Sequence, residues 1–399
     1  MSSKATLAKL IEMNWVRKAP LAARGQYHLL PDGALVFRVL ADFLMEWISY
    51  NLDAREIRTP LAYNWAAEPI RGHSGQFEQR LFIAGSDGGE VVFRPGGDFG
   101  VMSMLQTEQL SAKRLPMTFL ELCPSLRHGM RGELDGISRA RYFTLIDLHT
   151  LALGESSALE CYLSIVRAQH RLGLLFGFKS VLTWQVPKVL PDTMNRVVEK
   201  ASADLGDAVL FDTYDQQKNY WTIQHHFHTE DGIGYADGQF DMETPQTFHL
   251  RAVGMNPDEQ RMYLLHGAFD SVERWIVNLA TRCLNGRGDF PLWLCPVQVR
   301  LLVLHDNAWN SARRLDRFAA RSGVRLRAEM CGDSVAKRIN RSIEDWTPFT
   351  VVFGSREATP NALTDVYGRG GEKFQSTIED LVMRIARETE PWRTPAIDH

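Results

Sequence analysis

The sequence predicts a two-domain protein that mixes helices and strands and ends in a small α/β domain. At 399 residues the chain is too long for one small core, and about two to three domains of ~150 residues are expected. A polar, glycine-rich segment at residues 285–289 marks a boundary. After it, apolar β runs alternate with helical patterns, which is typical of an α/β domain. We therefore expect one domain at residues 1–288 and a second at residues 289–399.

The composition excludes several classes of protein. With 45% hydrophobic and 23% charged residues the chain can build a large core. A net charge of −3 excludes a globally basic nucleic-acid binder, although a local basic patch stays possible. The five cysteines form no C-x-x-C pair, which fits a reducing cytoplasm. The start lacks an apolar signal core, and the most apolar run, at 292–304, is too short to span a bilayer. We expect a cytoplasmic protein without membrane contact.

Hydrophobic periodicity predicts the elements of the first domain. Residues 30–52 carry one apolar stripe at helical spacing, after a turn signal at Pro31, which indicates a long helix. Further helical patterns begin near residue 101 and cover 158–178, 191–206 and 271–284. Apolar or alternating runs predict strands at 56–60, 80–84, 90–94, 117–122, 143–154, 209–212, 220–228, 238–250 and 261–266.

The second domain is predicted to alternate strands and helices. Strands are expected at 296–304, 324–330 and 349–354, and helices at 311–323, 334–346 and 376–390. The helices at 311–323 and 334–346 are rich in Arg and Lys. These side chains are either solvated helix faces or contacts for RNA phosphates, and the sequence leaves both interpretations open.

Four stretches carry a resemblance to a known family. The helix at 30–52 with the strand at 56–60, the stretch at 114–150, and LLHGAFDSVERWI at 264–276 resemble, in order, the three motifs of class II aminoacyl-tRNA synthetases. FPLWLCPVQVRLLVL at 290–304 resembles the opening of the anticodon-binding domain of the threonyl branch. Because the four occur in the family's order, the chain resembles a threonyl-tRNA synthetase over nearly its whole length.

The resemblance implies a fold, a reaction and partners. The fold is an α+β catalytic domain, an antiparallel six-stranded sheet with flanking helices, followed by an anticodon-binding-like α/β domain. The reaction is ATP-dependent activation of an amino acid to an aminoacyl-adenylate, with Mg²⁺ at the phosphates and transfer to tRNA, a carrier protein or an amine. A homodimer is also implied. Since the chain begins almost directly at the catalytic domain, we expect the family's N-terminal editing domains to be absent.

Three arginines and one glutamine are implied to bind ATP. Attack of a carboxylate on the α-phosphate builds negative charge, and a guanidinium suits it because it is planar, charged and bidentate. By resemblance, Arg127 holds the α-phosphate and the carboxylate, Arg139 reaches the phosphate tail, and Arg274 stacks on adenine. Gln246 matches a family glutamine at ATP. The alternative is that the arginines are solvated or salt-bridged surface residues.

Asp98, in the stretch RPGGDFG, decides what the amino-acid pocket can bind. Threonyl synthetases select threonine with a zinc ion held by one cysteine and two histidines. The resemblance places Asp98 on the cysteine, and His149 and His266 on the histidines. It also places Asp147 at the substrate hydroxyl and Tyr235 in the substrate loop.

Three interpretations of Asp98 are open. It is a zinc ligand, since one Asp and two His leave a free position on the metal. It binds a substrate amine directly, without a metal. Or it caps the helix that follows, as Asp often does. Because loss of the thiolate lowers the preference for Zn²⁺, we expect a metal-free or weakly metallated pocket.

Two departures from the family bear on activity. Gly129 stands where the family has a glutamate that helps to fix ATP, and the lysine of the loop at 234–242 is missing. The retained arginines favour an ATP-dependent ligase whose specificity differs from threonine. The two departures favour the alternative hypothesis, a non-catalytic paralogue that acts as an RNA-binding or regulatory subunit.

Overall fold

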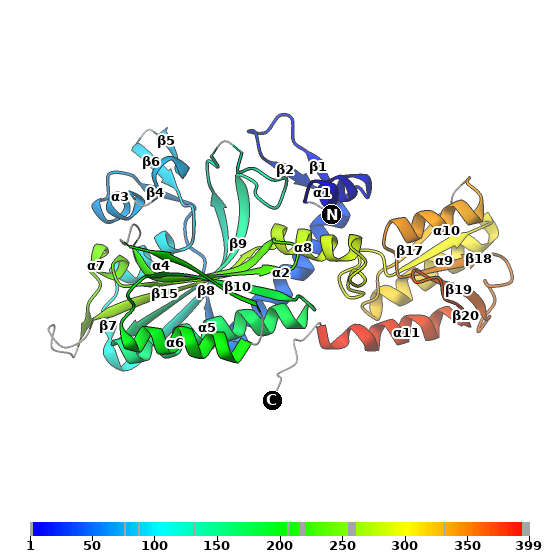
Figure 1. Ribbon diagram of the computed structural model, residues 1–399. Helices are drawn as coiled ribbons and strands as arrows, with labels where there is room; N and C mark the ends of the chain where they lie inside the picture. Colours follow the sequence, from blue (N-terminus) through cyan, green and yellow to red (C-terminus); the bar gives the residue numbers. More distant parts are fainter. Residues whose placement is uncertain are drawn as a thin grey trace. The chain divides into compact units, whose positions relative to one another are not determined.

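The structure is a computed structural model that describes residues 3–75, 77–86, 88–130, 132–205, 208–215, 220–253, 261–330 and 332–392 (Figure 1). The chain forms two compact units. The first unit holds the start of the chain, Val16–His28 and Leu44–Asn285. The second holds Ile11–Trp15, Leu29–Phe43 and the chain from Gly286 onward. Helix α2 (Pro31–Asn51), expected from its apolar stripe, contributes residues to both units.

A large sheet forms the centre of the first unit (Figure 1). Within the described residues it has eight strands in the order β11-β10-β12-β13-β15-β9-β8-β3. The strands are β3 (Arg55–Glu56), β8 (Met117–Leu126), β9 (Tyr142–Leu153), β10 (Ser180–Pro187), β11 (Ala208–Tyr214), β12 (Trp221–Thr229), β13 (Gly234–Asp241) and β15 (Met262–Ser271).

The large sheet is wider than the expected six strands. The strands from β10 to β8 pair antiparallel, and β11 and β3 add to the two edges in parallel. The strand expected at 238–250 ends early, at Asp241. Oδ1 of Asp241 accepts hydrogen bonds from the backbone N–H groups of Glu243 (2.7 Å) and Thr244 (3.0 Å). These bonds turn the chain into the short helix α7 (Thr244–Thr247).

Helices cover one face of the large sheet (Figure 1). Helix α5 (Glu155–Leu175) packs on β9, β13 and β15, and α6 (Asp192–Leu205) packs on α5. Gly267 of β15 permits this close contact, because a Cβ there would lie 2.8 Å from Ile165 of α5. Helix α8 (Val272–Leu284) follows β15 directly. Since side chains alternate along a strand, the residues next to Gly267 point to the opposite face.

Smaller elements belong to that opposite face. Helix α4 (Asp98–Gln106) packs Phe99 against Leu151 and Leu264 of the large sheet. A three-stranded antiparallel sheet and helix α3 precede it, with bounds β4 (Ala62–Asn64), α3 (Glu68–Ser74), β5 (Phe82–Ser86) and β6 (Gly89–Phe93). The remaining short elements are α1 (Ser3–Glu12), β1 (Val16–Lys18), β2 (Tyr27–Leu29), β7 (Leu110–Ser111) and β14 (Ala252–Val253).

The second unit contains a five-stranded sheet in the order β17-β16-β18-β19-β20. Its elements are β16 (Val299–Val303), α9 (Asp306–Arg321), β17 (Leu326–Met330), α10 (Val335–Glu344), β18 (Phe349–Phe353), β19 (Thr364–Gly368), β20 (Lys373–Ser376) and α11 (Ile378–Thr389). Strands β17, β16 and β18 are parallel, and β19 and β20 continue antiparallel. The hairpin β19–β20 was not expected, because it has no apolar run. No helix in the described ranges has both the length and the apolarity needed to cross a bilayer.

Gly33 lets the start of α2 approach the backbone of Trp15, within the second unit. A Cβ on Gly33 would lie 2.2 Å from the carbonyl oxygen of Trp15. Because a backbone atom cannot move aside like the end of a flexible side chain, G33A should lower the free energy of unfolding by about 1–3 kcal/mol. Chemical denaturation measures this, with A34S on the exposed side of the same turn as the control. Equal losses in the two variants would contradict the packing argument.

Candidate active site

Side chains from neighbouring strands meet on the face of the large sheet opposite α5. The register sets His266 of β15 directly across from His149 of β9, and their ring centroids are 5.1 Å apart. Asp147 lies two residues before His149 and therefore shares its face. The backbone N–H of Gly97, just before α4, donates to Oδ2 of Asp147 at 2.7 Å. The structure thus brings together three of the residues that the resemblance implied.

Asp98 joins this group through a histidine that the sequence did not single out. Nε2 of His73, in α3, lies 2.5 Å from Oδ2 of Asp98, and the two residues are 3% and 4% exposed. The ring of His73 packs edge-on against three aromatic rings, those of Phe77, Phe99 and Phe248. Burial alone would raise the pKa of Asp98, but His73, with weaker contributions from His266 and His149, holds it below its ordinary value.

Asp98 is not a helix cap. Helix α4 starts at Asp98 itself, with Gly97 at the cap position, and no side chain caps the helix. The carboxylate instead bonds His73 in α3. The capping interpretation is therefore wrong, and the metal and amine interpretations remain to be compared.

His266 is also paired with a carboxylate. Its Nε2 lies 3.0 Å from Oδ2 of Asp241. Burial lowers the pKa of His266, but the hydrogen bond and charge of Asp241 outweigh this and raise it. The imidazole of His149 has no hydrogen-bond partner within the described part of the chain, and burial lowers its pKa. At neutral pH His149 is therefore a neutral imidazole.

The zinc interpretation does not fit this arrangement. Among the residues that the structure describes, no three His, Cys, Asp or Glu side chains are placed to hold a metal ion. Oδ2 of Asp98 faces His73, and Nε2 of His266 faces Asp241. Asp98, His149 and His266 lie near one another, but they are not a preformed set of zinc ligands.

The face that carries Asp147, His149 and His266 is called the polar face below. Arg127 follows β8 directly. Its Nε donates to the carbonyl oxygen of Pro95 at 2.9 Å, and its guanidinium lies over the ring of Phe143, 5.3 Å from the centroid. Its terminal amino groups have no hydrogen-bond partner in the described ranges. A guanidinium fixed at Nε, with its terminal amino groups unpaired, is suited to bind an anion.

Arg274, near the start of α8, is fixed by two contacts. Its Nε donates to the carbonyl oxygen of Ser138 (2.9 Å), and Nη1 donates to Oδ2 of Asp270 (2.5 Å). Asp270 has a φ of 56°, in the left-handed region that non-glycine residues rarely adopt. Such strain is often found at functional sites.

Arg139 is exposed, and its backbone pairs with Asp135.

Asp237 of β13 interacts electrostatically with both arginines. Desolvation raises the pKa of Asp237 to about 7, and the charge of Asp270 adds to this, while Arg127 and Arg274 act in the opposite direction. A carboxyl group that titrates near neutrality beside two guanidinium groups is typical of a functional site.

The raised pKa predicts a pH dependence of stability. Asp237 titrates near 3.8 in the unfolded chain and near 7 in the folded one, so its stabilising contribution is complete below about pH 4 and is lost as the pH rises through 7. D237N should therefore flatten the fall in Tm between pH 5 and pH 8. Burial also raises the pKa of Glu273 to about 7, which preserves part of the slope. Scanning calorimetry at the two pH values measures the difference, and identical slopes would refute the assignment.

Two further residues that the resemblance implied lie elsewhere. Tyr235 is fully buried on the face covered by α5, where its ring stacks on Phe227 and its hydroxyl is 2.7 Å from Oγ of Ser180. The register shift between Phe227 and His228 is a β-bulge, which explains why Tyr235 is turned away from the polar face. Gln246 is exposed on α7, and its amide donates to a backbone carbonyl four residues earlier.

Sequence reasoning missed several residues of this site. His73 lies in a seven-residue helix outside any motif, so nothing in the sequence marked it. The Tyr220 ring centroid lies 5.2 Å from that of His73 and 5.6 Å from that of His266. Asp241 could have been found, because it lies on the strand predicted at 238–250, whereas Asp237, which shares its face in β13, lies one residue before that predicted strand.

Two arginines of the second unit have structural roles, and one of them, Arg338, lies in the basic helix predicted at 334–346. Arg338, in KRIN, donates to the carbonyl oxygen of Glu329 at 2.7 Å. Arg369, in VYGRGG, donates to the carbonyl oxygens of Trp346 (3.2 Å) and Phe290 (3.3 Å). These two side chains hold the unit together, so the RNA interpretation is not supported for them.

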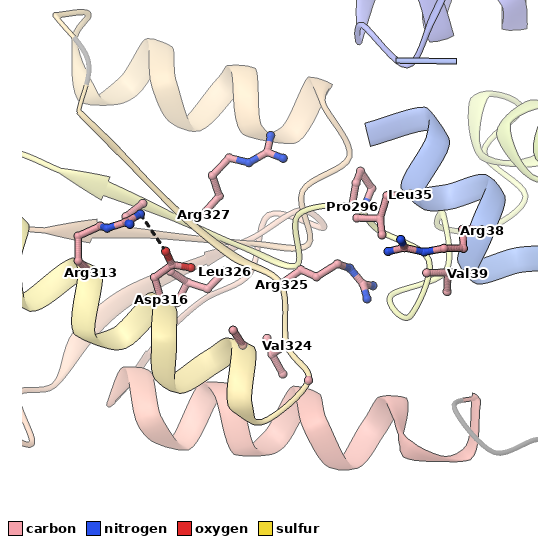
Figure 2. A pocket seen from close by; sticks show the side chains of 13 residues that line it. Leu35, Arg38, Val39, Pro296, Arg313, Asp316, Val324, Arg325, Leu326 and Arg327 are labelled. Atoms are coloured by element: carbon pink, nitrogen blue, oxygen red, sulfur yellow. Dashed lines mark hydrogen bonds and ion pairs between the residues drawn. The ribbon is translucent and has the colours of Figure 1, made fainter. Parts of the chain in front are cut away.

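A pocket of about 590 Å³ also lies in the second unit, between α2, α9 and β17 (Figure 2). Arg38 and Arg325 point into it from opposite sides. Arg313 pairs with Asp316 at 3.3 Å, and Arg327 pairs with Asp32 at 2.6 Å. The pocket is positively charged, but none of the residues implied for catalysis lines it.

The chain belongs to a known class of protein. The tRNA synthetase class II core domain (G, H, P, S and T) matches residues 82–281, half of the chain, so the chain belongs to this family. Within it, the chain is 26% identical to the threonine–tRNA ligase of Methanosphaera stadtmanae over 379 residues, which covers 92% of the chain and 61% of the relative. The corresponding ligase of Methanopyrus kandleri is 26% identical over 393 residues, covering 93% and 63%. The predicted likeness to threonyl-tRNA synthetases is confirmed.

Solved structures show the same fold. The RNA binding domain of threonyl-tRNA synthetase from Cryptosporidium parvum Iowa II superposes with a TM-score of 0.82 at 19% identity, covering 97% of this chain and 98% of that chain. Prolyl-tRNA synthetase from Cryptosporidium parvum, in complex with L-proline and AMP, gives 0.72 at 13% identity, covering 98% and 75%. The chain spans about three-fifths of the length of the curated threonine–tRNA ligases it matches.

Proposed function

We propose that the chain is an ATP-dependent ligase that activates an amino acid as an aminoacyl-adenylate. The observation that supports this most concerns two arginines near Asp237. Arg127 has terminal amino groups without a hydrogen-bond partner in the described ranges, and Arg274 is held at Nε by Ser138. The positive charge of each lowers the pKa of Asp237 on the polar face. Two guanidinium groups beside a group of carboxylates provide opposite charges for the two substrates, a polyphosphate and an ammonium group. Membership of the class II core family supports this assignment.

The residues act by positioning and by charge. Arg127 binds the α-phosphate and the attacking carboxylate, because one planar fork can contact both. Arg274, held by Ser138 and Asp270, is oriented before the nucleotide arrives, which lowers the reorganisation needed at the transition state. Mg²⁺ supplies further neutralisation of phosphate charge when bound, and it needs only one or two carboxylates, for which Asp237 is a suitable candidate.

The acyl acceptor is tRNA, a carrier protein or an amine, and the substrate is an amino acid other than threonine. The substituted residue at Asp98 supports the change in specificity. In this proposal residues 289–399 form an anticodon-binding-like domain, and the active protein is a homodimer.

The test is amino-acid-dependent exchange of pyrophosphate into ATP, measured with a panel of amino acids. Exchange with any member supports the ligase. Silence across the panel, with ATP binding intact by calorimetry, overturns it and supports the non-catalytic alternative.

One observation favours that alternative. Gly129, where the family has its ATP-fixing glutamate, has a φ of 43°, and a Cβ there would lie 2.9 Å from a methyl group of Leu134. A glutamate would therefore need both strained backbone and a shift of Leu134. A paralogue that binds nucleotide or RNA without catalysis would tolerate this loss.

A further inference from the structure

We propose that the pocket of the second unit binds a small organic phosphate, a phosphomonoester attached to an apolar group, between Arg38 and Arg325 (Figure 2). None of the residues assigned to ATP or to the amino acid lines this pocket. The inference therefore does not depend on the proposed function.

The first step is the charge of the pocket. Two of its four arginines are paired with carboxylates. Arg313 pairs with Asp316 at 3.3 Å. Arg327 donates from both terminal nitrogens to Asp32, at 3.1 and 2.6 Å. The excess positive charge of the pocket therefore comes from the other two arginines.

The second step is the placement of those two arginines. Arg38 points into the pocket from α2, and Arg325, which directly precedes β17, points in from the opposite wall (Figure 2). Arg38 is exposed and has no hydrogen bond or ion pair within the described ranges. Two like charges that face each other across a pocket repel, and an anion between them replaces this repulsion by attraction.

The third step is the orientation of Arg325. Its Nε and Nη2 donate to the carbonyl oxygens of Cys295 (2.8 Å) and Trp293 (2.6 Å). Because both acceptors are neutral groups, these bonds fix the guanidinium group without neutralising it. A guanidinium that is already fixed loses little conformational freedom when an anion binds.

The charge of the ligand follows from the two guanidinium groups. A phosphomonoester carries a charge of about −1.5 to −2 at neutral pH, and its oxygens match the planar fork of arginine. Each phosphodiester of an RNA chain carries a single negative charge. Two opposed arginines therefore suit a monoester better than the backbone of RNA.

The apolar wall of the pocket indicates that the ligand is organic. Leu35 and Val39 line it from α2, and Pro296, Val324 and Leu326 line it from the side of the five-stranded sheet. A volume of about 590 Å³ lies in the range of pockets for small organic ligands and is far larger than one phosphate ion needs. An apolar group on the ester would cover the wall that a free phosphate leaves exposed to water.

Phenyl phosphate is a suitable probe, because it joins a phosphomonoester to an apolar ring and contains no nucleoside. Calorimetry with the full-length protein should detect binding with a Kd of about 1 mM or lower. Phenyl sulfate has nearly the same shape but a single charge, and should bind at least about tenfold more weakly. Inorganic phosphate lacks the ring and should also bind at least about tenfold more weakly. No binding of phenyl phosphate, or equal affinity for either of the other two anions, would overturn the proposal.

A variant of Arg38 assigns the binding to this pocket. R38Q removes one charge at an exposed helix position, and should weaken the binding of phenyl phosphate by about 10–100-fold. R314Q is the matched control, because Arg314 is exposed on α9 beside Arg313 but lies outside the pocket and bonds Ser311. R314Q should bind as the original protein does, and Tm values establish that both variants fold. Unchanged affinity in R38Q, or equal losses in the two variants, would contradict the assignment.

A last measurement separates a small phosphate ester from RNA. Hexauridylate with a hydroxyl group at each end contains phosphodiesters only, so its affinity should be the same for R38Q and for the original protein. If hexauridylate bound in a manner that depends on Arg38 while phenyl phosphate did not bind, the pocket would be part of an RNA surface and the proposal would be wrong.

Discussion

R127A should reduce amino-acid-dependent pyrophosphate exchange by about 10²–10³-fold, which is the usual cost of removing one oriented donor to developing charge. The proposed role gives the reason: Nε is bonded to the carbonyl oxygen of Pro95, which leaves the terminal amino groups for the phosphate and the attacking carboxylate. R127K should recover little, since an ammonium group cannot bind two partners in one plane. Initial exchange rates at saturating amino acid measure both effects.

The control for this experiment is R196A. Arg196 is exposed on α6, on the other side of the large sheet from the polar face, and bonds only the backbone of its own helix. It carries the same loss of charge without touching the site. If R196A and R127A lost exchange equally, or if R127A lost none, the assigned role of Arg127 would be refuted.

R94M should lower the free energy of unfolding by about 3–5 kcal/mol, as expected when one partner of a buried ion pair is removed. Arg94 is 1% exposed and donates from Nη1 to both carboxylate oxygens of Glu121, at 3.0 Å each. Its Nε also donates to the carbonyl oxygen of Pro124 at 3.0 Å. After the substitution Glu121 would be a buried charge without an oppositely charged partner, with only the backbone N–H and the hydroxyl of Thr59 as donors. Denaturant titration measures the loss.

A double variant tests the cause. R94M/E121L removes both charges, so it should be more stable than the sum of the two single losses predicts. R313A, which breaks an exposed pair with Asp316, should cost less than about 1 kcal/mol. Additive losses in the double variant would show that the cost comes from packing instead of from the unpaired carboxylate.

Much of the fold was predictable because its signals are local. The apolar stripe of α2 and the long apolar run of β9 can be read from a few residues each. The predicted end of β13 was wrong because the chain turns where Asp241 bonds the following N–H groups, which periodicity does not reveal. The hairpin β19–β20 was missed because its strands depend on pairing with β18.

The residues of the candidate site also fall into two groups, those marked by local sequence motifs and those that depend on contacts distant in sequence. The arginines follow from family motifs, and so do Asp147 and His149 on β9, whose spacing puts them on one face of the sheet. The partner of Asp98 does not, since His73 reaches it from a helix 25 residues away in sequence. The position of Tyr235 was equally hidden, because a single bulge reverses the face on which a strand residue lies.

The left-handed backbone of Asp270 has a consequence for anyone who redesigns this protein. A glycine would relax that conformation and make the fold easier to maintain, yet it would release the arginine whose orientation depends on the carboxylate. At this position heat resistance and the orientation of Arg274 are in opposition, and a library screened for heat resistance alone would be expected to lose that orientation.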